Sequence, residues 1–237
     1  MTDASFSPFQ THLDQDRALK ILRAALDGAE DGELYLERAR GEALVFDDGR
    51  LRNASYDAEQ GFGLRAVRGE VTGYAHSTEI SEVALKSAAE TVRLAVGDGG
   101  GTLALPPSGR IMPLYAAIDP AESVSFAARV ALLREIDAFA RDLDPRVVQV
   151  SASIATSVQE VAILRPEGGL ATDTRPMARI NVSVIVESNS RRESGNAGGG
   201  GRIALDGLIA PEHWQGLVRE ALRIALVNLR SVPAPAG

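Results

Sequence analysis

Hydrophobic residues recur every three or four positions in four stretches of the chain, which is the spacing of one face of an α-helix. The stretches predict helices over residues 14–26, 81–97, 119–144 and 211–229. Asp14 and Ser81 are suited to accept hydrogen bonds from the first main-chain amides of the first two helices. The third helix opens at Asp119, or nearer Ser123 or Ser125, and Pro145 ends it.

Apolar and polar residues alternate between the first two helices, as they do in strands with one buried face. The strand-like segments are 34–39, 43–47, 50–56, 61–67 and 71–77. Asp48-Gly49 favours a tight hairpin turn because both residues tolerate positive φ, and Arg68-Gly69 is a weaker signal of the same kind. The short links predict an antiparallel meander.

Strand patterns return in the second half of the chain, at 147–156, 158–164 and 178–187. In the last of these the β-branched residues share one side, while Arg179, Asn181 and Ser183 share the other. Together the patterns predict an α+β protein of two small lobes, each an antiparallel sheet packed with helices. We expect a first lobe over 1–100, a Gly- and Pro-rich linker over 101–118, a second lobe over 119–233, and a short linker over 234–237.

The charge and the cysteine count exclude several kinds of site. The chain has 32 acidic and 25 basic residues, for a formal charge of -7, which disfavours direct binding to nucleic acid. It contains no cysteine, so it has no disulfide, thiolate ligand or cysteine nucleophile. The N-terminus lacks a targeting pattern, and no apolar run approaches the roughly 20 residues of a membrane-spanning helix. We therefore expect a cytoplasmic protein that does not enter a membrane.

The only histidines are His12, His76 and His213. A zinc-binding helix of the common peptidase type needs two histidines one turn apart. The positions one turn from His213 are Ile209 and Leu217, so His213 is expected to face solvent. His76 is expected at a strand end and His12 in the N-terminal segment. The sequence therefore predicts no metal ligand and no catalytic residue within this chain.

The run RRESGNAGGGGR at 191–202 is the most unusual composition in the chain. It lacks the Lys-Ser/Thr pair of a phosphate-binding loop. Two interpretations remain open. The glycines either connect a strand to the next element, or let main chain pass close to a peptide or to another domain, since glycine has no Cβ.

Four stretches resemble the TldD/PmbA family in the same order. They are GFGLRAVRGEVTGYAH at 61–76, IDAFARDLDPRVVQV at 136–150, RINVSVIVE at 179–187, and the run at 191–202. The last three resemble the TldD branch, which comprises zinc-dependent peptidases, and the resemblance spans roughly 34–235. The zinc motif of that family, His-Glu-x-x-x-His, is absent from these 237 residues.

The resemblance implies that this chain is the N-terminal portion of a peptidase acting on small or unfolded peptides. Its zinc and the glutamate that activates zinc-bound water would lie beyond Gly237. The resemblance favours a substrate-facing role for residues of the glycine-rich run, namely Arg191, Arg192, Glu193, Gly198, Gly199, Gly200 and Gly201.

Family members pair as two paralogous subunits, of which one carries the zinc motif. An alternative is therefore a non-catalytic substrate-binding or assembly subunit of a TldD/PmbA-type complex. A third reading is a free-standing binding or assembly protein that ends near Gly237.

Overall fold

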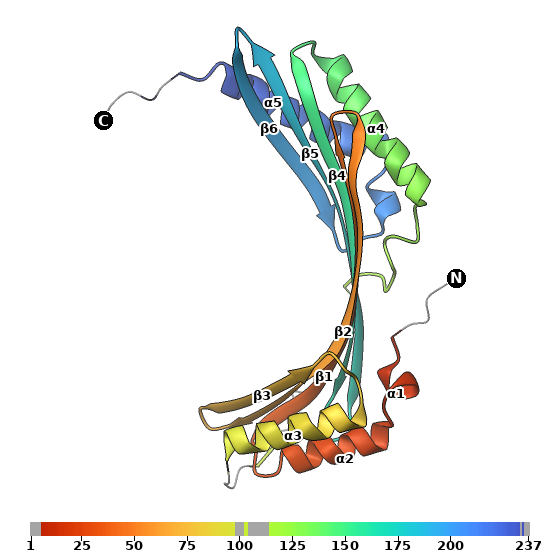
Figure 1. Cartoon of the computed structure of the whole chain (residues 1–237), viewed down its shortest axis with the longest axis vertical. Helices are drawn as coiled ribbons and strands as arrows, with labels where there is room; N and C mark the ends of the chain where they lie inside the picture. The colour runs from red at the N-terminus through yellow and green to blue at the C-terminus, as the bar shows by residue number, and fades with distance from the viewer. Residues whose placement is uncertain (1–5, 98–101, 104–113, 233, 235–237) are drawn as a thin grey trace. The chain divides into compact units, whose positions relative to one another are not determined.

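The computed structural model describes residues 6–97, 102–103, 114–232 and 234. Most of the predicted linker 101–118 and residues 235–237 of the predicted C-terminal linker lie outside the described residues. The elements, in chain order, are α1 (Pro8–Thr11), α2 (Gln15–Ala25), β1 (Asp31–Asp47), β2 (Arg50–Arg68), β3 (Val71–Ser77), α3 (Glu82–Val96), α4 (Phe126–Leu143), β4 (Val147–Leu164), β5 (Leu170–Ser188), β6 (Arg191–Gly201), the 3-10 helix η1 (Leu205–Gly207) and α5 (Pro211–Leu229) (Figure 1).

The strands form one six-stranded sheet in the order β3-β2-β1-β4-β5-β6. The pairs β2–β3 and β5–β6 are antiparallel. The predicted α+β class is confirmed. The strands are longer than the sequence patterns indicated, because the segments 34–39 and 43–47 join in β1, 50–56 and 61–67 in β2, and 147–156 and 158–164 in β4. Hydrogen bonds to neighbouring strands extend each strand across polar residues in which apolar and polar positions no longer alternate.

Local capping residues set the helix ends. Asp14 accepts a hydrogen bond from the Arg17 amide (2.9 Å) at the start of α2, and Ser81 accepts one from the Ala84 amide (3.2 Å) at the start of α3. Ser125, rather than Asp119, caps α4. The carboxylate of Asp119 instead accepts from the amide of Ala121 and pairs with Arg40.

The hairpin turns follow the residues that tolerate positive φ. Asp48 and Gly49 have φ of 48° and 77°, which confirms the predicted turn between β1 and β2. The turn between β2 and β3 is centred on Gly69-Glu70, one residue later than predicted, because Arg68 pairs with Val71. The turn between β5 and β6 was not predicted; it uses Asn189 and Ser190, with φ of 50° and 63°.

The chain divides into two compact units. Unit 1 comprises Met1–Ala39, Ala58–Leu114 and Gln159–Thr174, and unit 2 comprises Arg40–Asp57, Tyr115–Val158 and Arg175–Gly237. In unit 1, α2 and α3 pack on alternate strand residues, with a core that includes Leu22, Leu34, Leu64, Leu85 and Leu164. In unit 2, α4 and α5 pack on a core that includes Ile136, Ile154, Ile180, Val184 and Val218. We call the sheet surface of each unit that faces away from these helices its open face.

The spacing of hydrophobic residues in α4 predicts one buried face that runs from Phe126 to Leu143. Leu133, Ile136 and Ala140 are buried, as predicted, but Phe126 and Leu143 at the two ends are exposed. Two charged residues on the same helix are buried instead. Arg129 pairs with Glu42 at 2.5 Å, and Asp137 pairs with Arg141 at 3.1 Å. These partners compensate for the cost of removing the charges from water.

Candidate functional site

The glycine-rich segment is the edge strand β6 of the sheet. Arg191 lies opposite Ser188 and Gly201 lies opposite Ala178 in an antiparallel register with β5. A flexible connector is therefore excluded for these residues. Glycine alone disfavours a strand, but β5 supplies a partner rich in β-branched residues and α5 packs against β6, so tertiary contacts decide the conformation.

One side of β6 faces α5. Its closest point is Gly195, where an added Cβ would lie 2.1 Å from the Ala221 carbonyl oxygen and 2.5 Å from the Ala225 nitrogen. Gly199 lies opposite the buried Ile180 on this side, and an added Cβ there would be 3.6 Å from the Leu217 side chain. The absence of a side chain at Gly195 therefore permits close packing of helix on strand.

Alternate residues of a strand share a face, so Gly195 shares its side of β6 with Arg191, Glu193 and Gly201. Glu193 and Gly201 lie opposite the buried Val186 and Ala178. The guanidinium of Arg191 donates to Glu193 and to main-chain carbonyls at the end of α5. Four of the seven residues predicted to face substrate are thus on the α5 side of β6, and Arg191 is engaged in holding that helix.

The other three predicted residues, Arg192, Gly198 and Gly200, lie on the open face of unit 2. Arg192 pairs with Glu187. An added Cβ at Gly198 would be 2.4 Å from Asn181 Oδ1, so the Asn181 side chain lies directly over the bare backbone. At Gly200 an added Cβ would be 2.2 Å from the Ala178 carbonyl oxygen.

A hollow of about 470 Å³ lies on this open face, over β4, β5 and β6. Its lining combines apolar residues such as Val45, Val182 and Ala197 with the polar side chains of Ser151, Ser153, Arg179, Asn181, Ser183 and Asn196. Arg179 Nε donates to Asn181 Oδ1 at 2.7 Å, and Asn181 Nδ2 donates to Ser153 Oγ at 3.4 Å. Such groups offer both donors and acceptors, which is what the main chain of a peptide requires.

Of the residues predicted to face substrate, Gly198 belongs to this lining, and the other lining residues were not among those predicted. The signal was present for β5, because strict alternation puts Arg179, Asn181 and Ser183 on the face opposite the core. No sequence signal placed Ser153 of β4 beside Asn181, since that neighbour depends on how β4 and β5 pair.

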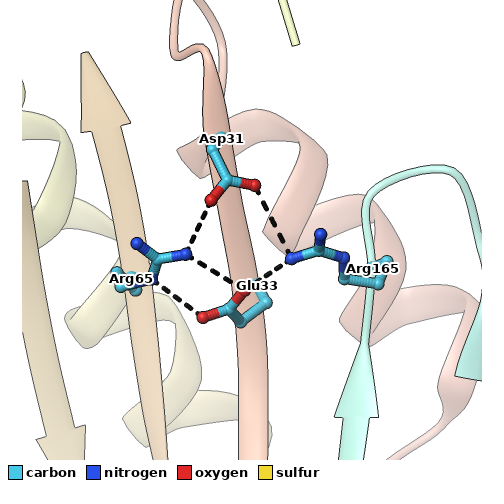
Figure 2. Close-up of polar contacts among 4 residues, drawn as sticks. All are labelled: Asp31, Glu33, Arg65 and Arg165. Carbon is cyan, nitrogen blue, oxygen red and sulfur yellow. Dashed lines mark hydrogen bonds and ion pairs between the residues drawn. The ribbon is translucent and has the colours of Figure 1, made fainter. Parts of the chain in front are cut away.

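Unit 1 carries a charged cluster on its open face, formed by Asp31, Glu33, Arg65 and Arg165 (Figure 2). Arg65 pairs with Asp31 at 2.6 Å and with Glu33 at 2.8 Å. Arg165 pairs with Glu33 at 2.5 Å and with Asp31 at 3.6 Å. The hydrogen bond to Glu33 raises the pKa of the Arg65 guanidinium, against the opposing effect of desolvation. Each carboxylate already has two cationic partners, which suits the cluster to cross-linking strands rather than to proton transfer.

The described residues do not form a metal centre. His12, His76 and His213 are all exposed, and the His76 ring stacks on Tyr74 with centroids 5.7 Å apart. Among the residues that the structure describes, no group of three or more histidine, aspartate or glutamate side chains could hold a metal ion. The described residues thus do not fit the zinc that the family resemblance implies. In the same part of the chain, no helix is long and apolar enough to cross a membrane.

Two family models match the chain in order. The model described as PmbA/TldA metallopeptidase domain 1 matches residues 32–97, and the PmbA/TldA metallopeptidase central domain matches residues 119–229. A metalloprotease TldD homolog of Haemophilus influenzae is 40% identical over 214 residues, which cover 86% of this chain and 44% of that protein. A metalloprotease TldD homolog of Buchnera aphidicola subsp. Schizaphis graminum is 34% identical over 214 residues, which cover 87% of this chain and 44% of that protein.

Solved structures share the fold at low identity. A protein of Thermotoga maritima described as a modulator of a DNA gyrase has a TM-score of 0.73 and 15% identity, with 94% of this chain and 49% of that chain covered. TldE from Thermococcus kodakarensis has a TM-score of 0.67 and 16% identity, with 87% of this chain and 46% of that chain covered. The chain spans less than half the length of the curated relatives it matches.

Proposed function

Because this chain belongs to the PmbA/TldD metallopeptidase family, we propose that it forms the N-terminal portion of a TldD-like zinc-dependent peptidase acting on small or unfolded peptides. The observation that carries the proposal is the 40% identity with a metalloprotease TldD homolog over most of this chain. The matched part covers 44% of that relative, and this supports assigning the zinc and the group that activates its water to the rest of a longer protein.

The contribution of this chain is to hold the peptide main chain on the open face of unit 2. The serine, asparagine and arginine side chains of the hollow donate and accept hydrogen bonds, and the lack of a Cβ at Gly198 lets the Asn181 side chain lie against the backbone there. Main-chain recognition of this kind accepts many peptide sequences. Of the residues predicted to face substrate, Gly198 lines the hollow together with Asn181 and Ser153, and Arg192 and Gly200 lie on the same open face.

Variants that fill the hollow test this role in the full-length protein with its partner subunit. Ser183→Leu and Asn196→Leu should lower kcat/KM for an unstructured peptide about tenfold by raising KM, because they displace the peptide rather than alter the zinc-bound water. Gly201→Ala is the matched control, since an added Cβ there meets no atom within 4 Å. Thermal unfolding of each variant checks that the fold is kept.

Unchanged cleavage by both filling variants would remove the hollow from the peptide path. Absence of stoichiometric zinc and of peptide cleavage in the full-length protein would refute the peptidase proposal itself.

The alternative is a non-catalytic substrate-binding or assembly subunit of a TldD/PmbA-type complex. It is supported by the fold shared with TldE and by the lack of a metal-ligating group among the described residues. The two functions predict different gene sequences beyond codon 237, because only the peptidase requires a His-Glu-x-x-x-His motif there. In both, the partner is a paralogous family subunit in the cytoplasm, and neither nucleic acid nor membrane is bound.

A further inference from the structure

A second hollow, of about 720 Å³, lies within unit 1 on strands β1, β2 and β3. We call it the tyrosine hollow. Its lining includes Tyr35 from β1, the buried Phe62 from β2, and Tyr74 and His76 from β3. Tyr74 is 60% exposed, although large apolar and aromatic side chains on a sheet are usually covered. Its volume falls within the roughly 300–1,000 Å³ of small-ligand pockets.

Two glycines of β2 make the floor of the tyrosine hollow. An added Cβ at Gly63 would lie 2.6 Å from the Tyr74 hydroxyl and 2.9 Å from its ring, so glycine allows the ring to lie across the strand. An added Cβ at Gly61 would lie 2.6 Å from the Ser77 carbonyl oxygen. The Tyr74 ring therefore lies on the backbone of Gly63, and its other face is accessible to a ligand.

The charges that line the hollow are negative. Glu37 and Glu59 belong to the lining, and the lining includes no lysine or arginine. Both hydrogen bonds to Glu37, from the Tyr35 hydroxyl at 2.5 Å and from Gln159 Nε2 at 2.7 Å, end on Oε2. Arg65 lies beside Tyr74 in the strand register, but its guanidinium is bound to Asp31 and Glu33.

Aromatic faces combined with carboxylates and no internal cation match one kind of ligand, a side-chain cation. The same chain uses this chemistry internally, where Arg38 lies over the Phe6 ring at 5.7 Å and Arg202 over the Tyr115 ring at 5.0 Å. We propose that the tyrosine hollow binds the cationic side chain of an arginine or lysine in a peptide. The cation contacts the rings of Tyr74 and His76 on one side and the carboxylates of Glu37 and Glu59 on the other.

This proposal rests on the proposed peptidase function for its choice of a peptide as the ligand. It adds a preference that the polar hollow of unit 2 lacks: peptides with a basic residue are held by a side chain as well as by main chain. The expected preference follows from charge and aromatic contact together, so an uncharged side chain of the same shape must bind more weakly.

The test uses the 237-residue chain and three capped tripeptides, acetyl-Gly-X-Gly-amide, in which X is arginine, lysine or citrulline. Citrulline keeps the shape of arginine without its charge. NMR signals from the Tyr74 and His76 rings are followed during titration. We expect saturable shifts with arginine and lysine, and about tenfold weaker binding of the citrulline peptide.

Two variants and two matched controls locate the site. Tyr74→Ser and Glu59→Gln should each weaken binding of the arginine peptide at least about threefold. The first control, Tyr56→Ser, alters a tyrosine of β2 that is also 60% exposed but lies outside the hollow. The second, Glu70→Gln, alters an exposed glutamate in the β2–β3 turn. Both should leave binding of the arginine peptide within twofold of the unaltered chain. Equal binding of the arginine and citrulline peptides, or retained binding in both Tyr74→Ser and Glu59→Gln, would overturn the proposal.

The assay contains no cleavage step, so its outcome is separable from the peptidase proposal. Loss of arginine binding with peptide cleavage intact in the full-length protein would refute the tyrosine hollow alone. Arginine binding without any cleavage would refute the peptidase function and leave the hollow as a peptide-binding site.

Discussion

Arg191 and Asn228 join β6 to α5 in both directions. Arg191 Nη2 donates to the main-chain oxygen of Asn228 at 3.0 Å, and Asn228 Nδ2 donates to the main-chain oxygen of Ser194 at 2.9 Å. Arg191 also donates to the Ser231 carbonyl at 2.8 Å. Carbonyls at a helix C-terminus have no partners within the helix, and a cation there also interacts favourably with the helix dipole.

Replacing Arg191 should therefore destabilise the protein. We expect Arg191→Ala to lower the free energy of unfolding by about 1–2 kcal/mol, since it removes four side-chain hydrogen bonds and a favourable charge at the end of α5. Arg192→Ala is the control, because the ion pair of Arg192 with Glu187 is exposed, and it should cost less than about 0.5 kcal/mol. Chemical denaturation measures both, and equal losses would contradict the assignment.

The glycines of β6 should differ sharply in their tolerance of a methyl group. Gly195→Ala should cost roughly 2–3 kcal/mol, because the added Cβ meets main-chain atoms of α5 that cannot move alone. Gly201→Ala should be nearly neutral, since nothing lies within 4 Å. Thermal unfolding would show this order, and a neutral Gly195→Ala would mean that α5 does not pack as closely as described.

The buried pair Arg38–Glu160 should contribute more than an exposed pair. Glu160 is 8% exposed and accepts from Arg38 at 2.8 and 3.0 Å and from the Phe6 amide at 2.9 Å. Arg38→Met removes a cation and its hydrogen bonds from this buried carboxylate and should cost about 3 kcal/mol. Arg17→Met removes the exposed pair with Glu82 and should cost less than about 0.5 kcal/mol, which urea denaturation would measure beside it.

Asp144 gives a pH-dependent contribution to stability. The hydrogen bond from the Arg146 side chain lowers the pKa of Asp144 below its ordinary value. A carboxyl whose pKa is lower in the folded state stabilises the fold above its unfolded pKa of about 3.9, and this contribution disappears as the pH falls through the folded pKa. Asp144→Asn should be less stable than the unaltered chain at pH 7, and the difference should shrink as the pH falls below the unfolded pKa of Asp144. A difference that does not change with pH would contradict this assignment.

Helix positions were accessible from the sequence because their signals are local. The cap at Ser81, the proline after Asp144 and the apolar stripe of α5 all lie within the elements they define, and the bounds of α5 were predicted at 211–229. The boundary at 101–118 stays a prediction, because most of those residues lie outside the described part of the chain.

The strand character of β6 could not be read from its residues. A run of glycines has no apolar alternation, and its conformation depends on β5 and on the contact of Gly195 with α5. The two hollows were hidden for a related reason. Asn181 and Ser153 come from different strands, as do Tyr35 and Tyr74, and the pairing of the strands brings each pair to one surface.

The position of β1 between β2 and β4 bears on how the protein is made. A chain emerging from the ribosome can pair β1 with β2 as soon as both are synthesised, but the other edge of β1 has no partner until β4 follows. Ala162 and Leu164 of β4 belong to the same buried core as Leu34 and Leu64. The N-terminal half must therefore wait, with an unpaired strand edge and an incomplete core, which is the state in which nascent chains most readily associate with one another and require chaperones.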